Sequence, residues 1–406
     1  ATLSGIRRYL GSGIIRGIGR GMADKIVGHF AEQTFDIIEN EPDRLMEISG
    51  IGKAKKKLIE SAWNNHHAVR RVMQFLQEND VGVVHAGQIL KTYGAGSMEV
   101  LTANPYMIAR DLPGIGFSLA DRIAMQSGVA PDDDRRLQAC LIHVLLSGVD
   151  DGHVYLTKDS LFKTAARMAG VNMELFSKVL DTLVDLDDLV VETVESDNRA
   201  EDRVYLTRLY QAETTIANRL KAMMTMPAIG GSVSGEQIVE TVLAKLAVKL
   251  SDEQLDVVND VIMEKAVVIT GGPGTGKTTL IRALCEIYKL MRRKVLLSAP
   301  TGRAARKLSE VTGKKAATLH KILGFDHTSQ TFGRNFSNPL DLDVFIVDEA
   351  SMVDTLLMAH LVDALPVTAS LILVGDTFQL PSVGPGNVLA DIIGSGTVTV
   401  FALTRI

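Results

Sequence analysis

A glycine-rich octapeptide carries the sharpest chemistry in this sequence. Gly271-Gly-Pro-Gly-Thr-Gly-Lys-Thr278 follows the apolar run Ala266–Thr270 and precedes a helical pattern, Thr279–Leu290. Glycines let the backbone curl so that its N–H groups face a phosphate chain, and the following helix directs its positive dipole end at the same anion. A chance glycine-rich turn would lack these flanks. The pattern therefore predicts a nucleotide-binding loop.

Two residues of this loop have separate expected roles. Lys277 would reach the β- and γ-phosphates of ATP, and Thr278 would ligate Mg²⁺. Gln254 lies upstream and has an amide able to read the edge of adenine, unless it is only a surface helix residue. The residues expected to bind ATP are Gln254, Gly272, Pro273, Gly274, Thr275, Gly276, Lys277, Thr278 and Thr279.

Paired acids follow a second apolar run. Val344–Val347 reads as a buried strand, and Asp348 and Glu349 come directly after it. Buried parallel strands open at the ligand edge of a sheet through their carboxyl ends. We expect Asp348 to hold Mg²⁺ and Glu349 to polarise the attacking water. The alternative is a pair of solvated loop acids.

An amide stands beyond a third apolar run, Ser370–Gly375. Gln379 could hydrogen-bond the γ-phosphate or the attacking water, which gives it a predicted catalytic role beside Lys277 and Glu349. A helix cap or a turn would explain Gln379 equally simply.

Further polar residues lie where a nucleic acid would pass the same edge. Thr301, Gly302 and Arg303 start a helix after the run Lys294–Ala299, where small residues permit close approach of a phosphodiester backbone. His320 opens another helix, although a lone histidine is more often structural. From the residues alone, close approach of a phosphodiester backbone is predicted only for the first of these two segments.

The elements that must position these residues alternate between strands and helices. The apolar runs at 266–270, 294–299, 344–347, 370–375 and 398–403 predict a parallel sheet covered by helices on both faces. The polar stretch Phe325–Asp341 is expected to leave this framework as a surface excursion. Residues 246–406 would form this α/β lobe, preceded by a helical connector at 211–245.

The first 130 residues predict an all-α region of tandem helix-hairpin-helix units. Short helices are separated by glycine turns at Ile15–Gly19, Ile48–Gly52 and Leu112–Gly116, with a weaker copy near Asp80–Val83. Such hairpins expose N–H groups to DNA phosphate without reading sequence. Gly50, Gly52 and Lys53 are the predicted contacts, unless the hairpins only pack together or bind protein.

An acidic module is expected between these regions, at residues 131–210. It carries sixteen acidic against nine basic residues, and helices precede the strands Leu189–Val194 and Arg203–Leu206. The polar stretch Glu195–Asp202 would be the turn between them. This order predicts a winged-helix-like module suited to spacing or docking.

Composition sets outer limits. The chain has 406 residues, a net charge of −5 and 46% hydrophobic residues, which suits a multidomain folded protein and excludes a globally basic nucleic-acid coat. No apolar run approaches the roughly 20 residues that a membrane helix needs. No basic-then-apolar leader is visible, and Cys140 and Cys285 lie far apart. We expect a cytoplasmic protein with no membrane partner.

Taken together, these motifs resemble a known family. GGPGTGKT, FIVDEAS and GDTFQLPSVGPG, with APTGRAA and LSDEQ, are similar in order and spacing to superfamily 1 DNA helicases of the RecD type. The upstream hairpins resemble the longer, stand-alone branch. The resemblance implies a RecA-like lobe, the roles given above, and ATP-driven 5′-to-3′ movement on single-stranded DNA. It also implies contact with the DNA strand for Thr301, Gly302, Arg303 and His320. It further implies single/double-strand junctions and repair-protein partners in DNA repair or recombination.

The resemblance also predicts how much of a complete motor is present, and it has to be weighed against other functions. Such motors have two lobes, and Phe401–Ile406 is similar to the approach to a later motif, so a fragment is expected. A DNA-binding adaptor that uses ATP as a switch, without translocating, is the alternative; unwinding of 5′-tailed duplex by the complete protein would discriminate. A nuclease is disfavoured, because no acidic metal cluster stands out beyond the ATP site.

Residues 1–406 alone are expected to bind nucleotide weakly and to unwind DNA negligibly. Arginines supplied across the cleft between two such lobes contribute rate factors on the order of 10³ or more. A strand-displacement assay on 5′-tailed duplex measures this, and robust unwinding by these residues would refute it.

Overall fold

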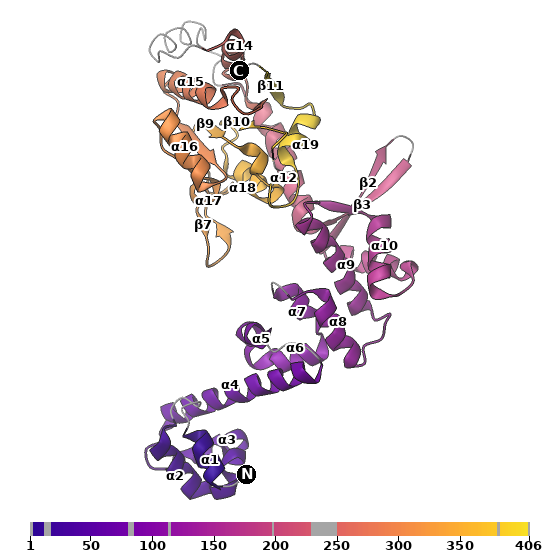
Figure 1. Cartoon of the computed structure of the whole chain (residues 1–406), viewed down its shortest axis with the longest axis vertical. Coiled ribbons are helices and arrows are strands. Elements are labelled where there is room, and N and C mark those ends of the chain that lie inside the picture. The colour runs from indigo at the N-terminus through magenta and orange to yellow at the C-terminus, as the bar shows by residue number, and fades with distance from the viewer. Residues whose placement is uncertain are drawn as a thin grey trace. The chain divides into compact units, whose positions relative to one another are not determined.

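The computed structural model describes residues 3–11, 18–79, 85–112, 115–196, 199–228, 250–379 and 382–404 (Figure 1). Contacts between residues divide the chain into two compact units. The first comprises Ala1–His143 and Phe162–Leu180, and the second comprises Val144–Leu161 and Asp181–Ile406.

Short helices form most of the first unit, as the glycine-punctuated sequence predicts. Ile26, Leu45, Ile59 and Trp63 are fully buried in its N-terminal core. The helices are α1 (Leu3–Leu10), α2 (Arg20–Phe30), α3 (Thr34–Asn40), α4 (Lys53–Glu78), α5 (Ala86–Tyr93), α6 (Ser97–Ala103), α7 (Tyr106–Asp111) and α8 (Phe117–Gln126), with 3-10 turns at η1 (Ala31–Gln33), η2 (Pro42–Glu47) and η4 (Gly94–Gly96).

This part of the unit contains one structural repeat. Ala31 and Gly94 end equivalent helices in nearly the same backbone conformation, with φ and ψ of 51° and −125° against 55° and −126°. The next helix of each copy starts with a hydroxyl, from Thr34 or Ser97, that donates over 2.7 Å to the carbonyl of that residue. Matching local bonds at corresponding positions indicate a duplicated supersecondary unit.

Of the four predicted hairpins, the second is fully described. Gly50 has a φ of 98°, which a residue with a side chain rarely adopts, and Gly52 precedes the first turn of α4. The N–H of Ile51 donates to the carbonyl of Ile48 over 3.1 Å, which closes the turn. In the other three hairpins, residues 12–17, 80–84 and 113–114 lie outside the described residues.

A buried ion pair joins α8 to α9 (Asp134–Asp150). The Arg136 guanidinium donates to both oxygens of Asp121, over 2.7 and 2.9 Å, and also to the carbonyls of Pro131 and Ala169. Tyr106 donates to the same carboxylate over 2.9 Å. The guanidinium, the carboxylate and the tyrosine hydroxyl would each be costly to bury without these partners. The network therefore fixes how α8 packs against α9 at the end of the helical region.

The acidic segment has the predicted order of helices and then a hairpin. Helices α10 (Lys158–Ala169) and α11 (Phe176–Asp185), with η5 (Met173–Leu175) between them, precede the hairpin of β2 and β3. This hairpin forms a three-stranded antiparallel sheet, in the order β1-β3-β2, with a strand that comes before α10. Its strands are β1 (Tyr155–Thr157), β2 (Leu189–Ser196) and β3 (Arg199–Leu206). The predicted turn at 195–202 is wrong, because Glu195 pairs with Ala200 and Ser196 with Arg199, so strand pairing continues almost to the tip.

A six-stranded parallel sheet forms the centre of the second unit, which confirms the predicted α/β lobe. The strand order is β11-β4-β10-β9-β5-β6, and all pairs are parallel. The strands are β4 (Ala266–Gly271), β5 (Val295–Ala299), β6 (Ala316–Thr318), β9 (Val344–Val347), β10 (Ser370–Gly375) and β11 (Thr399–Leu403). The short edge strand β6 is the one that the sequence patterns did not predict.

Helices cover both faces of this sheet. Alternate strand residues divide between two cores: Val268, Val347 and Leu373 face one, and Val267, Ile346 and Ile372 face the other. The helices are α12 (Thr207–Met224), α14 (Asp252–Val261), α15 (Lys277–Leu290), α16 (Gly302–Thr312), α17 (Leu319–Ile322), α18 (Thr355–Ala364) and α19 (Val388–Gly394), with η6 (Ala350–Met352). The predicted excursion contains the two-stranded hairpin β7 (Phe325–Asp326) and β8 (Thr331–Phe332).

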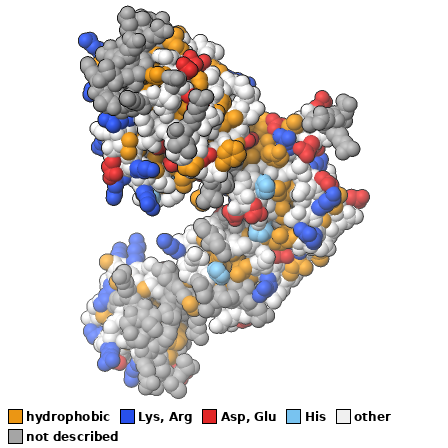
Figure 2. All heavy atoms as spheres, turned by 45° about the horizontal axis from the view of Figure 1, so that its top comes forward, with side chains coloured by type: hydrophobic (Ala, Val, Ile, Leu, Met, Phe, Trp, Pro, Cys, Tyr) orange, Lys and Arg blue, Asp and Glu red, His pale blue; other side chains and the backbone are white. Residues whose placement is uncertain are grey.

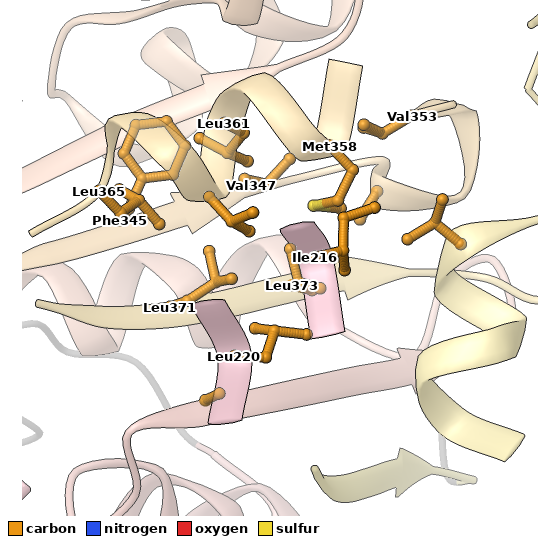
Figure 3. Packing of buried hydrophobic residues seen from close by; sticks show 14 of the residues in the cluster. Ile216, Leu220, Phe345, Val347, Val353, Met358, Leu361, Leu365, Leu371 and Leu373 are labelled. Atoms are coloured by element: carbon orange, nitrogen blue, oxygen red, sulfur yellow. The ribbon is translucent and has the colours of Figure 1, made fainter. Parts of the chain in front are cut away.

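Helix α12 overlaps the predicted connector, and it belongs to the core of the lobe. Figure 3 shows Ile216 and Leu220 of α12 directed at Leu371 and Leu373 of β10. Arg219 on the same helix donates over 3.1 Å to the carbonyl of Val362 at the end of α18. Burial of apolar area therefore attaches α12 to the sheet along its length.

Candidate functional site

The glycine loop lies between the central strand β4 and helix α15. Gly274 and Gly276 have φ values of 86° and 83°, in the left-handed region that favours glycine. A Cβ on Gly276 would lie 2.4 Å from the amide nitrogen of Gln254, and one on Gly271 would lie 2.8 Å from the carbonyl oxygen of Leu403. The backbone of Leu403 therefore requires glycine at position 271, and the left-handed φ favours glycine at position 276.

Polar bonds within the loop fix its curl. The Thr275 hydroxyl donates to the carbonyl of Gly272 over 2.9 Å. The Lys277 amino group donates to the carbonyls of Gly271 and Gly272 over 2.5 and 2.8 Å. The lysine thus lies across the loop, at the place where phosphate oxygens would accept from it. Pro273 is exposed, and Thr278 and Thr279 lie half-buried in the first turn of α15.

Gln254 contacts this loop from outside the sheet. Its amide nitrogen donates to the carbonyl of Thr275 over 3.0 Å, and its amide oxygen accepts from the N–H of Ser251 over 3.1 Å. Ser251 accepts in turn from the N–H of Gln254, so the two residues form a capping box on α14. The amide thus holds α14 against the loop, a support role that the sequence patterns did not suggest.

Strand register brings the predicted acids to the same edge. Strand β10 lies between β4 and β9, with Thr270 level with Gly375 and Val347 level with Leu373. Asp348 and Glu349 therefore leave the sheet close to the loop. Burial raises the pKa of the Asp348 carboxyl to about 6, and the neighbouring Glu349 charge adds to this. The positive charges of Lys277 and Lys307 act in the opposite direction.

Glu349 is held in an unusual state. Its φ and ψ are 54° and 41°, a left-handed conformation that costs a residue with a side chain about 1 kcal/mol or more. Its Oε2 atom is buried and has no hydrogen-bond partner among the described residues, and the same holds for the Ser351 hydroxyl. A buried carboxylate oxygen without a donor is suited to a water molecule or a cation.

The donor set fits Mg²⁺ with a triphosphate. Carboxylate and hydroxyl oxygens are the protein ligands that Mg²⁺ takes, with phosphate oxygens completing its shell. Thr278 and Asp348 supply such oxygens, and the unpartnered oxygen of Glu349 lies on the residue after Asp348. Lys277 supplies a compact positive charge on the loop.

The loop after β10 contributes a buried acid, Asp376, to which the sequence motifs assigned no role. Asp376 is 3% exposed, and its carboxylate accepts from the N–H of Phe378 over 3.0 Å. The N–H of Gln379 donates to the carbonyl of Asp376 over 3.2 Å. Gln379 itself is exposed, and residues 380 and 381 lie outside the described residues.

Two predicted DNA-contact sites follow strands of the same sheet. Thr301 caps α16 by accepting from the N–H of Ala304 over 3.2 Å, and Gly302 and Arg303 are exposed in its first turn. His320 is exposed on α17, where its ring meets Phe325 edge-on at 5.4 Å. Thr301 and His320 thus have structural contacts as well as accessible surface.

The hairpin residues Gly50, Gly52 and Lys53 lie in the first unit, separate from the loop. Gly52 and Lys53 are exposed at the start of α4, and Lys57 is exposed one turn later. Lys56 forms an ion pair with Asp43 at 2.5 Å, so its charge is partly neutralised. Figure 2 shows mainly Lys and Arg, with few acids, around the described surface of the N-terminal helices.

Fold and site together define a P-loop nucleotide-binding lobe joined to a helix-hairpin-helix region. The family models that match are an AAA domain at residues 254–385, the ATP-dependent RecD2 DNA helicase HHH domain at 65–155, and a SAM-like helix-hairpin-helix tandem at 12–62. In these regions the chain is similar to the RecD-like DNA helicases.

Similar proteins include two helicase types. The ATP-dependent RecD2 DNA helicase of Deinococcus radiodurans is 33% identical over 378 residues, covering 92% of this chain and 52% of that protein. The RecBCD enzyme subunit RecD of Mycolicibacterium smegmatis is 35% identical over 216 residues, covering 47% of this chain and 38% of the subunit. The chain therefore spans about half of the first relative and less of the second.

Solved structures give a weaker likeness. The Pif1 helicase from Candida albicans aligns with a TM-score of 0.32 at 26% identity, covering 39% of this chain and 40% of that one. The likeness to RecD-like DNA helicases rests on the sequence matches. Among the described residues, no helix combines the length and the apolar character that a membrane crossing requires.

Replacing Glu349 by Gly is expected to raise the free energy of unfolding by about 1 kcal/mol, because glycine adopts the left-handed conformation without cost and removes a buried unpaired carboxylate. Chemical denaturation measures the change. Glu310→Gly, at an exposed position within α16, is the matched control and should lower stability by about 1 kcal/mol. Destabilisation by Glu349→Gly would show that the conformation carries no strain.

Proposed function

We propose that the chain forms the ATP-binding lobe and the DNA-binding region of an ATP-dependent DNA helicase that moves 5′ to 3′ on single-stranded DNA. The observation that supports this most directly is the placement of Lys277 and Asp348 at one edge of the sheet, after strands β4 and β9, which both pair with β10. A lysine on a glycine loop and a half-buried acid at the end of the next strand but one form the arrangement that phosphoryl transfer requires.

In this proposal the site residues have the following roles. Lys277 turns from the loop carbonyls to the β- and γ-phosphates of ATP, while the backbone N–H groups of residues 274–279 surround the phosphates. Thr278 and Asp348 hold Mg²⁺, which supplies neutralisation of phosphate charge when bound. Glu349 accepts a proton from the attacking water, and Gln379 contacts that water or the γ-phosphate. Gln254 contacts adenine or supports the loop.

DNA contact is proposed for both units. Thr301, Gly302, Arg303 and His320 face the strand on the lobe, and the hairpin at Gly50, Gly52 and Lys53 binds backbone phosphate. Single/double-strand junctions and a role in repair or recombination follow from the likeness to RecD2 and to RecD of the RecBCD enzyme. Repair-protein partners are part of the same proposal.

Lys277→Ala in the complete protein is expected to lower DNA-stimulated ATP hydrolysis by at least about 100-fold, because a donor to the transferring phosphate is lost. Turnover is measured with single-stranded DNA, with duplex DNA and without DNA. Lys289→Ala, in the last turn of the same helix, is the control and should leave turnover unchanged.

Assays on the complete protein also distinguish the helicase from the ATP-switched adaptor. Unwinding of 5′-tailed duplex by the unsubstituted protein supports the helicase. ATP-dependent DNA binding without unwinding would instead favour the ATP-switched adaptor. Normal turnover in Lys277→Ala would remove Lys277 from the mechanism.

Lys53→Gln is expected to weaken single-stranded DNA binding equally for different sequences and to reduce the slope of log affinity against log salt by about 1, as for the loss of one phosphate contact. Fluorescence anisotropy at several salt concentrations measures both. Lys56→Gln is the matched control, because Asp43 already pairs with Lys56. Equal effects of the two substitutions would place the DNA elsewhere.

A further inference from the structure

An apolar cavity in the second unit lies away from the glycine loop. Its volume is about 320 Å³, within the range of small-ligand sites. Ile216 and Leu220 of α12 form one wall, and Val388 and Ile392 of α19 form another. Thr355, the first residue of α18, and the segment before β11 complete the lining.

Two carboxylates interrupt this apolar lining. Glu213 on α12 and Asp391 on α19 both line the cavity and come from different walls. Neither has an ion pair or a side-chain hydrogen bond within the described part of the chain. Partial burial raises the pKa of each carboxyl, and the charge of Asp391 raises that of Glu213 further. Two like charges in an apolar surround therefore lack a counter-charge.

Nearby cations do not remove this imbalance. Arg203 acts on Glu213 from the three-stranded sheet, yet its guanidinium bonds to Glu201 at 3.3 Å and lies over the ring of Tyr155. Glu192, from the same sheet, adds a further negative charge. Lys221 also lines the cavity, but it lies about two helical turns along α12 from Glu213 and is exposed. Two negative charges, from Asp391 and Glu192, and one positive charge, from Arg203, therefore act on Glu213.

A third polar group lies in the lining. The Thr355 side chain is 1% exposed, and its hydroxyl has no hydrogen-bond partner among the described residues. Buried hydroxyls in folded proteins are nearly always paired, so this one is available to a bound molecule. The Thr355 N–H donates to the carbonyl of Pro385, which ties the cavity to the loop that follows Gln379.

We propose that this cavity binds an organic cation, an ammonium or guanidinium group carried on an aliphatic or aromatic body. The body occupies the apolar walls, the cation lies between Glu213 and Asp391, and the Thr355 hydroxyl is a further polar contact. An anion is repelled by the carboxylates, and a neutral molecule leaves them unpaired. A free amine and a basic side chain beside an apolar one in a peptide share this chemistry.

The test uses residues 1–406 without nucleotide or DNA, so it is independent of the proposed helicase activity. 3-Phenylpropylammonium is titrated while the methyl NMR signals of Ile216, Val388 and Ile392 are followed. Neutral 3-phenylpropanol and anionic 3-phenylpropionate are the matched probes. The cation is expected to bind at least about five-fold more tightly than the alcohol, and the anion more weakly than both. Equal affinities, or no shift of these methyl signals, would overturn the proposal.

Substitutions check the two carboxylates. Glu213→Gln with Asp391→Asn should bring the cation to the affinity of the alcohol, and Glu213→Gln alone should give part of that loss. Lys221→Gln is the opposite control and should leave cation binding unchanged or stronger. Thermal unfolding confirms that each variant folds. Retained preference for the cation in the double variant would contradict the assigned role of the carboxylates.

Two further probes separate the sources of the cation. Acetyl-Phe-Arg-amide is compared with acetyl-Phe-citrulline-amide, which has the same shape without the charge. A charge-dependent preference for the dipeptide over the free amine assigns the cavity to a peptide segment, and the reverse order assigns it to a small molecule. Both orders support the cation site.

Discussion

Lys277 and Asp348 belong to different elements of the second unit, yet the charge of the lysine acts on the pKa of the buried carboxyl. This coupling requires β4, β10 and β9 to lie side by side in register, because Asp348 directly follows β9 and the glycine loop that carries Lys277 follows β4. It also requires the glycine loop to curl back over the strand ends. The two apolar cores that cover the sheet thus serve to hold a positive and a negative group at one edge.

Close packing around this edge leaves little freedom. Gly276 has Gln254 against it, and a Cβ on Gly375 would lie 2.7 Å from a methyl carbon of Leu389. Glu349 is left-handed with a buried unpaired oxygen, and both features cost stability. Surrounding structure must over-determine such a residue, and buried cores on both faces of the sheet supply that constraint. Glu349 thus combines a strained backbone with a buried unpaired oxygen at the place where chemistry is proposed.

The first unit contains two copies of one backbone arrangement, and the two copies differ in which residues they expose and which they bury. After the hairpin at Gly52 the chain continues with Lys53, which is exposed. At the equivalent place after Gly116 it continues with Phe117, which is buried between the rings of Tyr106 and His143 at 5.9 Å from each. One copy keeps a basic, accessible helix start, while the other buries the corresponding residue against α9.

Local pattern determined much of this protein by itself. Strand positions, the parallel sheet, the helical first unit and the likeness to RecD-like DNA helicases follow from apolar runs, glycine turns and GGPGTGKT, because these signals depend on neighbours in sequence. The short edge strand β6, the long pairing of β2 with β3 and the core position of α12 depend on contacts between distant residues. The same is true of the bond from Gln254 to Thr275, the raised pKa of Asp348 and the cavity at Glu213 and Asp391. Burial and the approach of separate elements create these features, so only the tertiary structure decided them.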